Sequence, residues 1–245
     1  MRLGVHVTLC TGRMYSGTRQ IAERLNLREP VACIDGSQIV DATTHQELAS
    51  VPLAAIGVTG LFQALGEHEP VAFVFSGDRV YFDGKGADYL PYVTTWSEQT
   101  VRLDTVLDGK HWSAEERSIA ALVALGSEEQ IAAIHTKLGA HSEVLQSACF
   151  PLRRYDGFWG MVVRAAQVDK GTAVEWLAAH HGVTPEEIVA VGDWLNDIPM
   201  LKRAGRTFAM GQAPEEVKSA ATDVLEADVW SGGGLAEAAE RAGLL

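Results

Sequence analysis

The stretch Ile188–Leu201 reads IVAVGDWLNDIPML and decides the fold class of this 245-residue chain. Ile188–Val191 is a short apolar run typical of a buried strand, and it leads into Asp193. Asn196 and Asp197 follow about one helical turn later. Oxygen-bearing side chains at the end of a strand lie where α/β proteins place their ligand sites. Because such oxygens suit a hard cation that also holds phosphate, the stretch predicts a site for Mg²⁺.

Strands and helices alternate around this stretch and near the start of the chain. Some segments have apolar residues at helical spacing, and short apolar runs bounded by turn residues separate them. This alternation is typical of βαβ units, in which helices cover a parallel sheet. We therefore predict an α/β fold with a doubly wound, Rossmann-like parallel core. The expected strands are Val5–Cys10, Val31–Ile34, Gln38–Val40, Ile188–Val191, Thr207–Met210 and Asp223–Leu225, and the expected helices are Ser16–Leu25, Gly171–His181, Ile198–Ala204 and Glu215–Ala221.

The middle of the chain has a different pattern. Val71–Phe75 and Arg79–Phe82 are spaced as the strands of a hairpin around a Ser-Gly-Asp turn. An amphipathic helix and two further strands follow. Hairpins and helices together predict an α+β domain at residues 55–160, inserted between core segments at residues 1–54 and 161–245. The helix is expected at Glu128–Leu138 and the two strands at Ser142–Phe150 and Gly160–Ala165.

The composition excludes several classes of protein. The net charge of −12 argues against binding to nucleic acid, because phosphate-backbone binding needs a basic surface. No apolar run reaches the length of a membrane span, and the N-terminus lacks the pattern of a signal peptide. Cys10, Cys33 and Cys149 lack metal-ligand spacing and are expected to be free thiols. We therefore expect a cytoplasmic protein, monomer or homodimer, without membrane or nucleic-acid partners.

Asp193 has two interpretations. Aspartate is a favoured helix N-cap, so this residue can simply begin the helix that follows the strand. A carboxylate at a strand end can equally hold a metal ion. Asn196 and Asp197 favour the metal, because positions three and four residues apart share one face of a helix. Asp197 can either bind the ion itself or orient the groups around it.

Three other segments can bind an anion. Lys170 opens a predicted helix and can hold a phosphoryl oxygen, although a lone lysine is more often a solvated surface residue. Thr11-Gly12-Arg13 follows a predicted strand, where a hydroxyl, backbone N–H groups and a guanidinium can hold a phosphate. An ordinary strand-to-helix turn would look similar. Asp35-Gly36-Ser37 is also a strand-end turn, and turn chemistry explains it without a ligand.

Taken together, these segments resemble the motifs of the haloacid dehalogenase superfamily. They are most similar to its Cof-type, subfamily IIB sugar-phosphate phosphatases, which carry an α/β cap domain between the second and third motifs. Leu9–Arg13 resembles the second motif and Asp169-Lys170-Gly171 the third. Gly192–Leu201, with its Pro-Met-Leu end, resembles the fourth, and Ala209–Ala213 resembles the segment after the next strand. The resemblance covers nearly the whole chain and implies that the inserted domain is the cap.

The resemblance implies a Mg²⁺-dependent phosphatase of small phosphorylated metabolites such as sugar phosphates. In this family an aspartate attacks phosphorus, and water then hydrolyses the aspartyl-phosphate. The cap would close over the site and select the substrate. The implied roles are catalysis for Thr11 and Lys170, substrate binding for Gly12, Arg13, Asp35, Gly36 and Asn196, and metal binding for Asp193 and Asp197.

The family's first motif, an Asp-x-Asp-Gly-Thr loop that carries the nucleophile, has no counterpart before Thr11. Cys33–Ser37 imitates this motif superficially, but it follows the second motif and has Cys where the nucleophile belongs. It better matches the family's Asn-Gly-Ala turn, with Asp35 replacing Asn. By family topology the strand that precedes the first motif is central, between the strands of the second and fourth motifs.

A gap at that place would leave backbone groups of two buried strands unpaired, at a cost of about 1–3 kcal/mol each. We therefore expect one of two arrangements. Either the polypeptide begins upstream, with Met1 inside the helix before the second motif, or another segment fills the gap. The missing nucleophile also favours an alternative function, that of a catalytically inactive phosphate-binding or partner-binding module.

Overall fold

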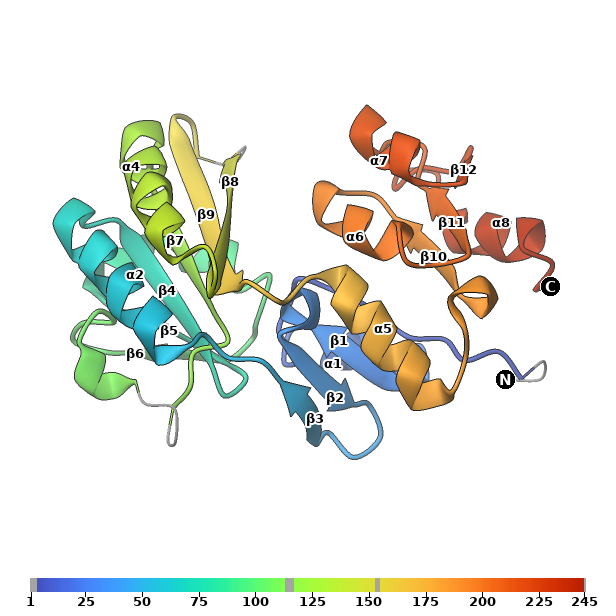
Figure 1. The fold of residues 1–245 in the computed structure, drawn as a ribbon, viewed down its shortest axis with the longest axis horizontal. Helices are drawn as coiled ribbons and strands as arrows, with labels where there is room; N and C mark the ends of the chain where they lie inside the picture. Colours follow the sequence, from blue (N-terminus) through green and yellow to red (C-terminus); the bar gives the residue numbers. More distant parts are fainter. Residues whose placement is uncertain (1–3, 113–116, 153–154, 245) are drawn as a thin grey trace.

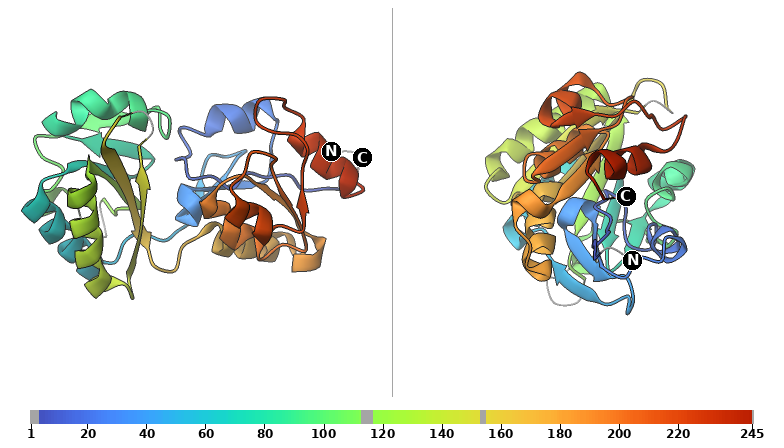
Figure 2. Two further views of the ribbon diagram at one scale, coloured as in Figure 1. Left: turned by 90° about the horizontal axis from the view of Figure 1, so that it is seen from above. Right: turned by 90° about the vertical axis from the view of Figure 1, so that its right-hand side faces the viewer.

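A computed structural model describes residues 4–112, 117–152 and 155–244 of the chain. Figures 1 and 2 show two lobes, one built on a six-stranded sheet and the other on two smaller sheets. The chain passes from the second lobe to the first after β3 and returns after β9, so the first and the last described residues both lie in the second lobe. The predicted place of Met1 inside a helix lies outside the described residues.

The first lobe is a sheet in the order β6-β5-β4-β7-β9-β8, covered on one face by α2 and α4 (Figure 1). Leu61, Leu65, Ile131 and Ile134 on these helices are fully buried against it. The predicted hairpin is confirmed as the antiparallel pair β4 and β5. The strands are β4 (Val71–Ser76), β5 (Arg79–Phe82), β6 (Thr100–Arg102), β7 (Ala121–Ser127), β8 (Leu145–Pro151) and β9 (Phe158–Ala165), and the helices are α2 (Ala55–His68) and α4 (Glu128–Leu138).

The opposite face of this sheet connects the two lobes. Phe73 and Phe75 of β4 lie in one buried cluster with Met14 and Cys33 of the second lobe. The ring of Trp96 packs edge-on against Phe75, with ring centroids 5.7 Å apart. The lobes therefore share an apolar core along this face. The short helical segments of this lobe are η2 (Gly84–Tyr89), α3 (Leu90–Val93), η3 (Gly109–His111) and η4 (Gly139–His141).

The inserted domain predicted at residues 55–160 coincides in position with this first lobe. Helix α2 begins at Ala55, whereas β9 continues past residue 160 to Ala165. The domain boundaries themselves stay a prediction.

The first sheet of the second lobe is an antiparallel meander, β1-β2-β3. It confirms the two short strands expected around Asp35-Gly36. All four residues of β1 are buried. The segment that contains the meander consists of α1 (Arg19–Arg24), β1 (Pro30–Cys33), η1 (Ile34–Gly36), β2 (Gln38–Asp41) and β3 (Glu47–Ser50).

The predicted strand Val5–Cys10 is wrong. Only Cys10 forms a β-bridge, parallel to Ala32, with the N–H of Ala32 donating to the carbonyl of Leu9 at 2.9 Å. The preceding residues lie in no strand, and Val7 is 45% exposed. The segment has the residue types of a strand, but a strand needs a ladder of partners along its length, and here the pairing stops after one bridge.

The second sheet of this lobe is parallel, in the order β10-β11-β12. Ala190 and Ala209 face a cluster with Met200 of α6, whereas Phe208 faces α8 on the other side of the sheet. Helices on both faces agree with the predicted doubly wound core. The elements are α5 (Lys170–His181), η5 (Pro185–Glu187), β10 (Val189–Gly192), η6 (Leu195–Asp197), α6 (Ile198–Leu201), β11 (Arg206–Ala209), α7 (Glu215–Ala220), β12 (Asp223–Val224) and α8 (Gly234–Arg241).

The parallel sheet is interrupted beside β10. Among the described residues, no strand pairs with the edge of β10 that faces away from β11, so no described strand fills the expected gap. Helix α5 joins the two pieces of this lobe instead. Its Leu177 packs with Ala32 of β1, and its Val174 packs with Ala190 of β10.

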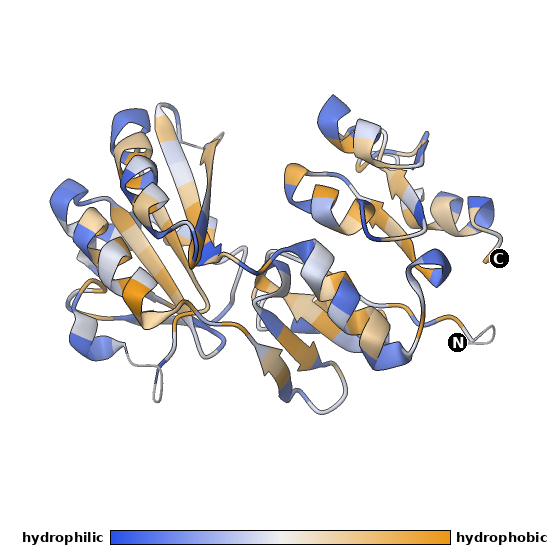
Figure 3. Ribbon diagram, in the orientation of Figure 1, coloured by the Kyte–Doolittle hydropathy of each residue, from blue (hydrophilic) through white to orange (hydrophobic). Residues whose placement is uncertain are grey.

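The hydropathy of the chain follows these layers. Figure 3 shows hydrophobic residues gathered on the strands of both lobes and hydrophilic residues at the outer ends of the helices. Within the described ranges, no helix combines the length and the apolar character needed to cross a membrane.

Candidate functional site

The loop after β10 is held by the carboxylate of Asp197. Its Oδ2 accepts hydrogen bonds from the backbone N–H groups of Asp193 at 2.8 Å and Trp194 at 2.9 Å. A Cβ on Gly192 would lie 2.6 Å from the Cβ of Asp197, so the close return of the loop requires glycine there. Asp197 is buried, whereas Asp193 is exposed. Asp193 caps neither η6 nor α6, so the helix-cap interpretation of this residue is wrong.

Lys170 lies at the centre of the site, at the start of α5. Its Nζ donates to Oδ1 of Asp197 at 2.5 Å and lies 3.9 Å from Oδ1 of Asp35. The side chain is buried, so the solvated-surface interpretation is wrong. Burial opposes its charge, but the carboxylates of Asp197 and Asp35 outweigh that effect and raise the pKa of Lys170 above its ordinary value. The ammonium therefore stays charged throughout the physiological pH range.

Asp35 lies on the turn after β1 and brings three segments together. Its N–H donates to the carbonyl of Thr11 at 2.8 Å, which places the turn beside the predicted second motif. Its Oδ1 accepts a hydrogen bond from Nδ2 of Asn196 at 2.8 Å. Asp35 has a φ of 52° and Gly36 a φ of 105°, and a Cβ on Gly36 would lie 2.9 Å from the carbonyl oxygen of Asp169. The turn and the start of α5 therefore touch because position 36 is glycine.

Thr11 and Gly12 line the same place. Oγ1 of Thr11 accepts a hydrogen bond from the N–H of Arg13 at 3.1 Å, which forms a local Ser/Thr turn. A Cβ on Gly12 would lie 3.4 Å from Oδ1 of Asp35, so the backbone passes close to the carboxylate. Arg13 is exposed, and only its backbone groups contact the site among the described residues. The structure thus brings Thr11, Gly12 and Asp35 to the site and leaves the Arg13 guanidinium apart.

Arg164, which the sequence analysis missed, belongs to this cluster. It lies near the end of β9 in the first lobe and forms a buried ion pair with Oδ2 of Asp35. A charged residue that ends an otherwise apolar strand is the only sequence signal for it. Gln212, within the segment Ala209–Ala213, also reaches the site, because its Nε2 donates to Oδ2 of Asp193 at 3.3 Å.

The charges of the cluster do not balance. Three carboxylates, those of Asp35, Asp193 and Asp197, face two basic groups, those of Lys170 and Arg164. Asp35 and Asp197 are paired, whereas no basic side chain lies within 4.0 Å of Asp193 in the part of the chain that the structure describes. The exposed carboxylate of Asp193 is therefore the one left to a cation from solution.

The cluster contains a thiol that is unsuited to nucleophilic attack. Cys10 packs beside Lys170, with its Sγ 3.9 Å from the Lys170 carbonyl oxygen. Burial raises the pKa of Cys10 to about 12. The thiolate is the reactive form, so this side chain stays inert at neutral pH. All three cysteines are free, as predicted.

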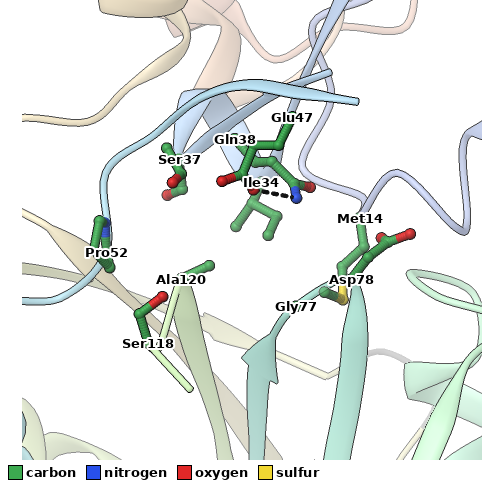
Figure 4. A pocket seen from close by; sticks show the side chains of 11 residues that line it. Met14, Ile34, Ser37, Gln38, Glu47, Pro52, Gly77, Asp78, Ser118 and Ala120 are labelled. Atoms are coloured by element: carbon green, nitrogen blue, oxygen red, sulfur yellow. Dashed lines mark hydrogen bonds between the residues drawn. The ribbon is translucent and has the colours of Figure 1, made fainter. Parts of the chain in front are cut away.

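A polar cavity of about 120 Å³ lies between the lobes, beside the Asp35-Gly36 turn (Figure 4). Ser37 and Gln38 line it from the second lobe, and Asp78 lines it from the first. Ser37 Oγ and Gln38 Oε1 are buried without a protein hydrogen-bond partner in the described ranges. A cavity of this size and polarity suits water. None of the predicted site residues lines it, so it is distinct from the carboxylate cluster.

Comparison with known proteins supports the motifs. A family model for haloacid dehalogenase-like hydrolases matches residues 1–236. The chain is 25% identical over 224 residues to the 5-amino-6-(5-phospho-D-ribitylamino)uracil phosphatase YitU of Bacillus subtilis, covering 89% of this chain and 78% of that protein. It is 24% identical over 235 residues to the pyridoxal phosphate phosphatase YbhA of Escherichia coli, covering 91% of this chain and 81% of that protein.

Solved structures share the fold. A haloacid dehalogenase-like hydrolase from Bacteroides thetaiotaomicron superposes with a TM-score of 0.80 at 21% identity, covering 98% of this chain and 88% of that one. The subclass IIB sugar phosphatase BT4131 superposes with a TM-score of 0.74 at 18% identity, covering 99% and 87%. The predicted α/β fold class and the motif resemblance are confirmed.

Proposed function

We propose that this chain, which belongs to the haloacid dehalogenase-like hydrolases, is a Mg²⁺-dependent phosphatase of small phosphorylated metabolites such as sugar phosphates. Its relatives YitU and YbhA are phosphatases. The observation that carries the proposal is the exposed carboxylate of Asp193, which has no ion pair among the described residues. It lies on the loop held by Asp197, which also binds the buried ammonium of Lys170, and Thr11 lies on the segment bonded to the neighbouring Asp35 turn. Relatives named for pyridoxal phosphate and a phosphoribitylamino-uracil support a small phosphate ester as substrate.

The donor set fits Mg²⁺. This ion keeps several waters and is held by one or two carboxylates together with phosphate oxygens. Asp193 would supply the carboxylate. Both oxygens of Asp197 already accept hydrogen bonds from the protein, so we assign Asp197 to holding the Asp193 backbone and Lys170 in place. When bound, Mg²⁺ would neutralise the charge that builds up on the phosphoryl oxygens.

The protein's own groups would hold the phosphoryl group. The Lys170 ammonium, oriented by Asp197, offers a fixed positive charge in a buried place, where it acts more strongly than in water. The Thr11 hydroxyl donates to a phosphoryl oxygen, and Gly12 lets that oxygen approach the backbone. Arg164 neutralises Asp35, so that a second negative charge does not repel the phosphate. Asn196 holds the Asp35 carboxylate beside the Asp193 loop through its hydrogen bond.

The proposed reaction passes through an aspartyl-phosphate formed on the first aspartate of an Asp-x-Asp-Gly-Thr loop, a motif that does not occur in the sequence given. Cys10 does not replace it, because its thiol stays protonated. The second candidate function is a catalytically inactive module that binds phosphate or a partner protein through the same site.

We further propose the cytoplasm as the compartment and a monomer or homodimer as the functional state. The core would comprise residues 1–54 and 161–245, and the cap, residues 55–160, would close over the site and select the substrate.

Hydrolysis of p-nitrophenyl phosphate with Mg²⁺ tests the proposal. Turnover by the 245-residue chain that is abolished by Asp193→Ala and retained in Asp104→Ala, an exposed aspartate of the first lobe, supports the phosphatase. Turnover only after the chain is extended upstream by an Asp-x-Asp-Gly-Thr segment supports the phosphatase with a nucleophile from that segment. Phosphate binding without turnover in either form supports the inactive module.

A further inference from the structure

A second group of metal-ligating side chains lies at the opposite end of α5 from Lys170. His6 belongs to the N-terminal segment, Glu29 directly precedes β1, and His181 is the last residue of α5. At 1.5 Å per residue, a helix from Lys170 to His181 spans roughly 16 Å. The group is therefore separate from the phosphate site and has no part in the proposed function.

The three side chains converge on one point. Nδ1 of His6 lies 2.8 Å from Oε1 of Glu29, and Nε2 of His181 lies 3.6 Å from Oε2 of the same carboxylate. One ligand atom from each residue lies within 4.8 Å of the other two. The imidazole rings of His6 and His181 are stacked, with centroids 4.4 Å apart. Three segments distant in sequence thus present two nitrogens and one carboxylate to a common place.

His181 supplies a second, independent observation. Its Nε2 is buried, and it has no hydrogen-bond partner among the described residues. A buried polar atom without a hydrogen bond is costly, and a metal ion held between this nitrogen, the Glu29 carboxylate and the His6 imidazole would satisfy it.

We propose that His6, Glu29 and His181 bind Zn²⁺. Two imidazoles and one carboxylate form a known three-ligand set for zinc, with the fourth position left to water. His6 is half exposed, so an ion can enter from solution. Mg²⁺ prefers oxygen ligands and would not compete well for two imidazoles.

The bound ion would fasten the N-terminal segment to the core. Residues 5–9 lie in no strand. The backbone pairing of this segment begins only at its end, where Leu9 and Cys10 pair with Ala32. Zinc would tie that segment at His6 to the start of β1 and to the end of α5. Its loss would therefore loosen the segment that leads to Thr11, without changing any residue of the phosphate site.

Titration calorimetry with Zn²⁺ on the metal-free, full chain tests the proposal. It is done in the Asp193→Ala background, so that the phosphate site does not contribute. We expect one saturable Zn²⁺ site, weakened by about tenfold or more in His6→Ala and His181→Ala. His135→Ala is the matched control, because this exposed histidine lies on α4 of the first lobe and is not part of the group. Its affinity for Zn²⁺ should equal that of the background.

Glu29→Gln tests the third ligand and can be used if a histidine variant fails to fold. The amide keeps the size and a hydrogen-bond acceptor but is a poor zinc ligand, so Zn²⁺ binding should weaken while the melting temperature without metal stays unchanged. Co²⁺ should give visible ligand-field absorption that the same variants abolish. Zn²⁺ affinity that is equal in the background, His6→Ala and Glu29→Gln would overturn the proposal, as would the absence of saturable binding. Either result would mean that His6, Glu29 and His181 interact only with one another and bind no metal ion.

Discussion

The two lobes differ in how their sheets are completed. In the first lobe β4, β7 and β9 each have a hydrogen-bonded strand on both sides, and both faces of the sheet carry a buried core. In the second lobe, within the described residues, β10 has a strand on one side only, and Cys10 forms a single bridge. Backbone pairing completes the first lobe. Helix α5 and polar side chains hold the second together.

The buried charges lie where the backbone pairing stops. Asn196 of the β10 side donates to Asp35 of the β1 side, and Lys170 joins Asp197 to Asp35 across the same interruption. Polar groups in such a place are costly unless all are paired. The comparison teaches that the second lobe depends on a few buried charge pairs, whereas the first depends on backbone pairing and apolar burial.

The largest expected effect is the loss of a core aromatic ring. Phe73→Ala, on β4 of the first lobe, should lower the free energy of unfolding by about 3–5 kcal/mol, because its ring is fully buried in the large cluster that the two lobes share. Phe208→Ala in the second lobe should cost less, because its small cluster with Leu225 and Ala238 can relax. Urea unfolding of both variants measures the difference. A cost at Phe208 equal to or above that at Phe73 would break the comparison.

Removal of a charge partner tests the second lobe directly. Arg164→Met should cost about 3 kcal/mol, because it leaves the Asp35 carboxylate buried beside a lysine 3.9 Å away. The double variant Arg164→Met with Asp35→Asn should recover most of that loss, since no unpaired charge remains. A double-mutant cycle in urea measures the coupling. Additive costs would mean that the pair contributes nothing.

Amide hydrogen exchange compares the two sheets at the backbone. Val189 and Val191 of β10 should exchange on the order of 100-fold faster than Val123 of β7, because only β7 is paired on both sides. Mass spectrometry of peptides from the two strands resolves this. Equal exchange rates in the two strands would show that the backbone N–H groups at the free edge of β10 have partners outside the sheet.

The smallest effect concerns helix caps. Ser127 caps α4 through Gln130, and Asp169 caps α5 through Thr172. Ser127→Ala should cost about 1 kcal/mol. Asp169→Ala should cost more, up to about 2 kcal/mol, because α5 is the helix that joins the pieces of the second lobe. Thermal unfolding of the two variants measures this difference. Equal losses of stability would argue against a joining role for α5.

Local signals in the sequence predicted most of the fold. The helix Glu128–Leu138 is found with the predicted bounds, because Ser127 and Gln130 form a capping box and the apolar residues recur at helical spacing. Helix α6 ends at Leu201, earlier than predicted, and α8 was not predicted. Val5–Cys10 failed because strand formation depends on partners that are distant in sequence, and its residue types carry no information about them.

The site was predictable where residues are close in sequence. Asp193 and Asp197 are four positions apart, and their loop is folded as one unit. Arg164 was missed because its partner Asp35 lies 129 positions away. Spacing in the sequence also did not indicate that Asp197 uses both oxygens within the protein, which leaves Asp193 as the exposed carboxylate.

Calorimetric titration of orthophosphate with and without Mg²⁺ tests most directly whether the Asp193 loop and Lys170 hold a metal and a phosphate together. We predict saturable phosphate binding that requires Mg²⁺, weakens by about tenfold or more in Asp193→Ala and stays unchanged in Asp104→Ala. Phosphate binding that is independent of Mg²⁺, or equally strong in Asp193→Ala, would contradict the account.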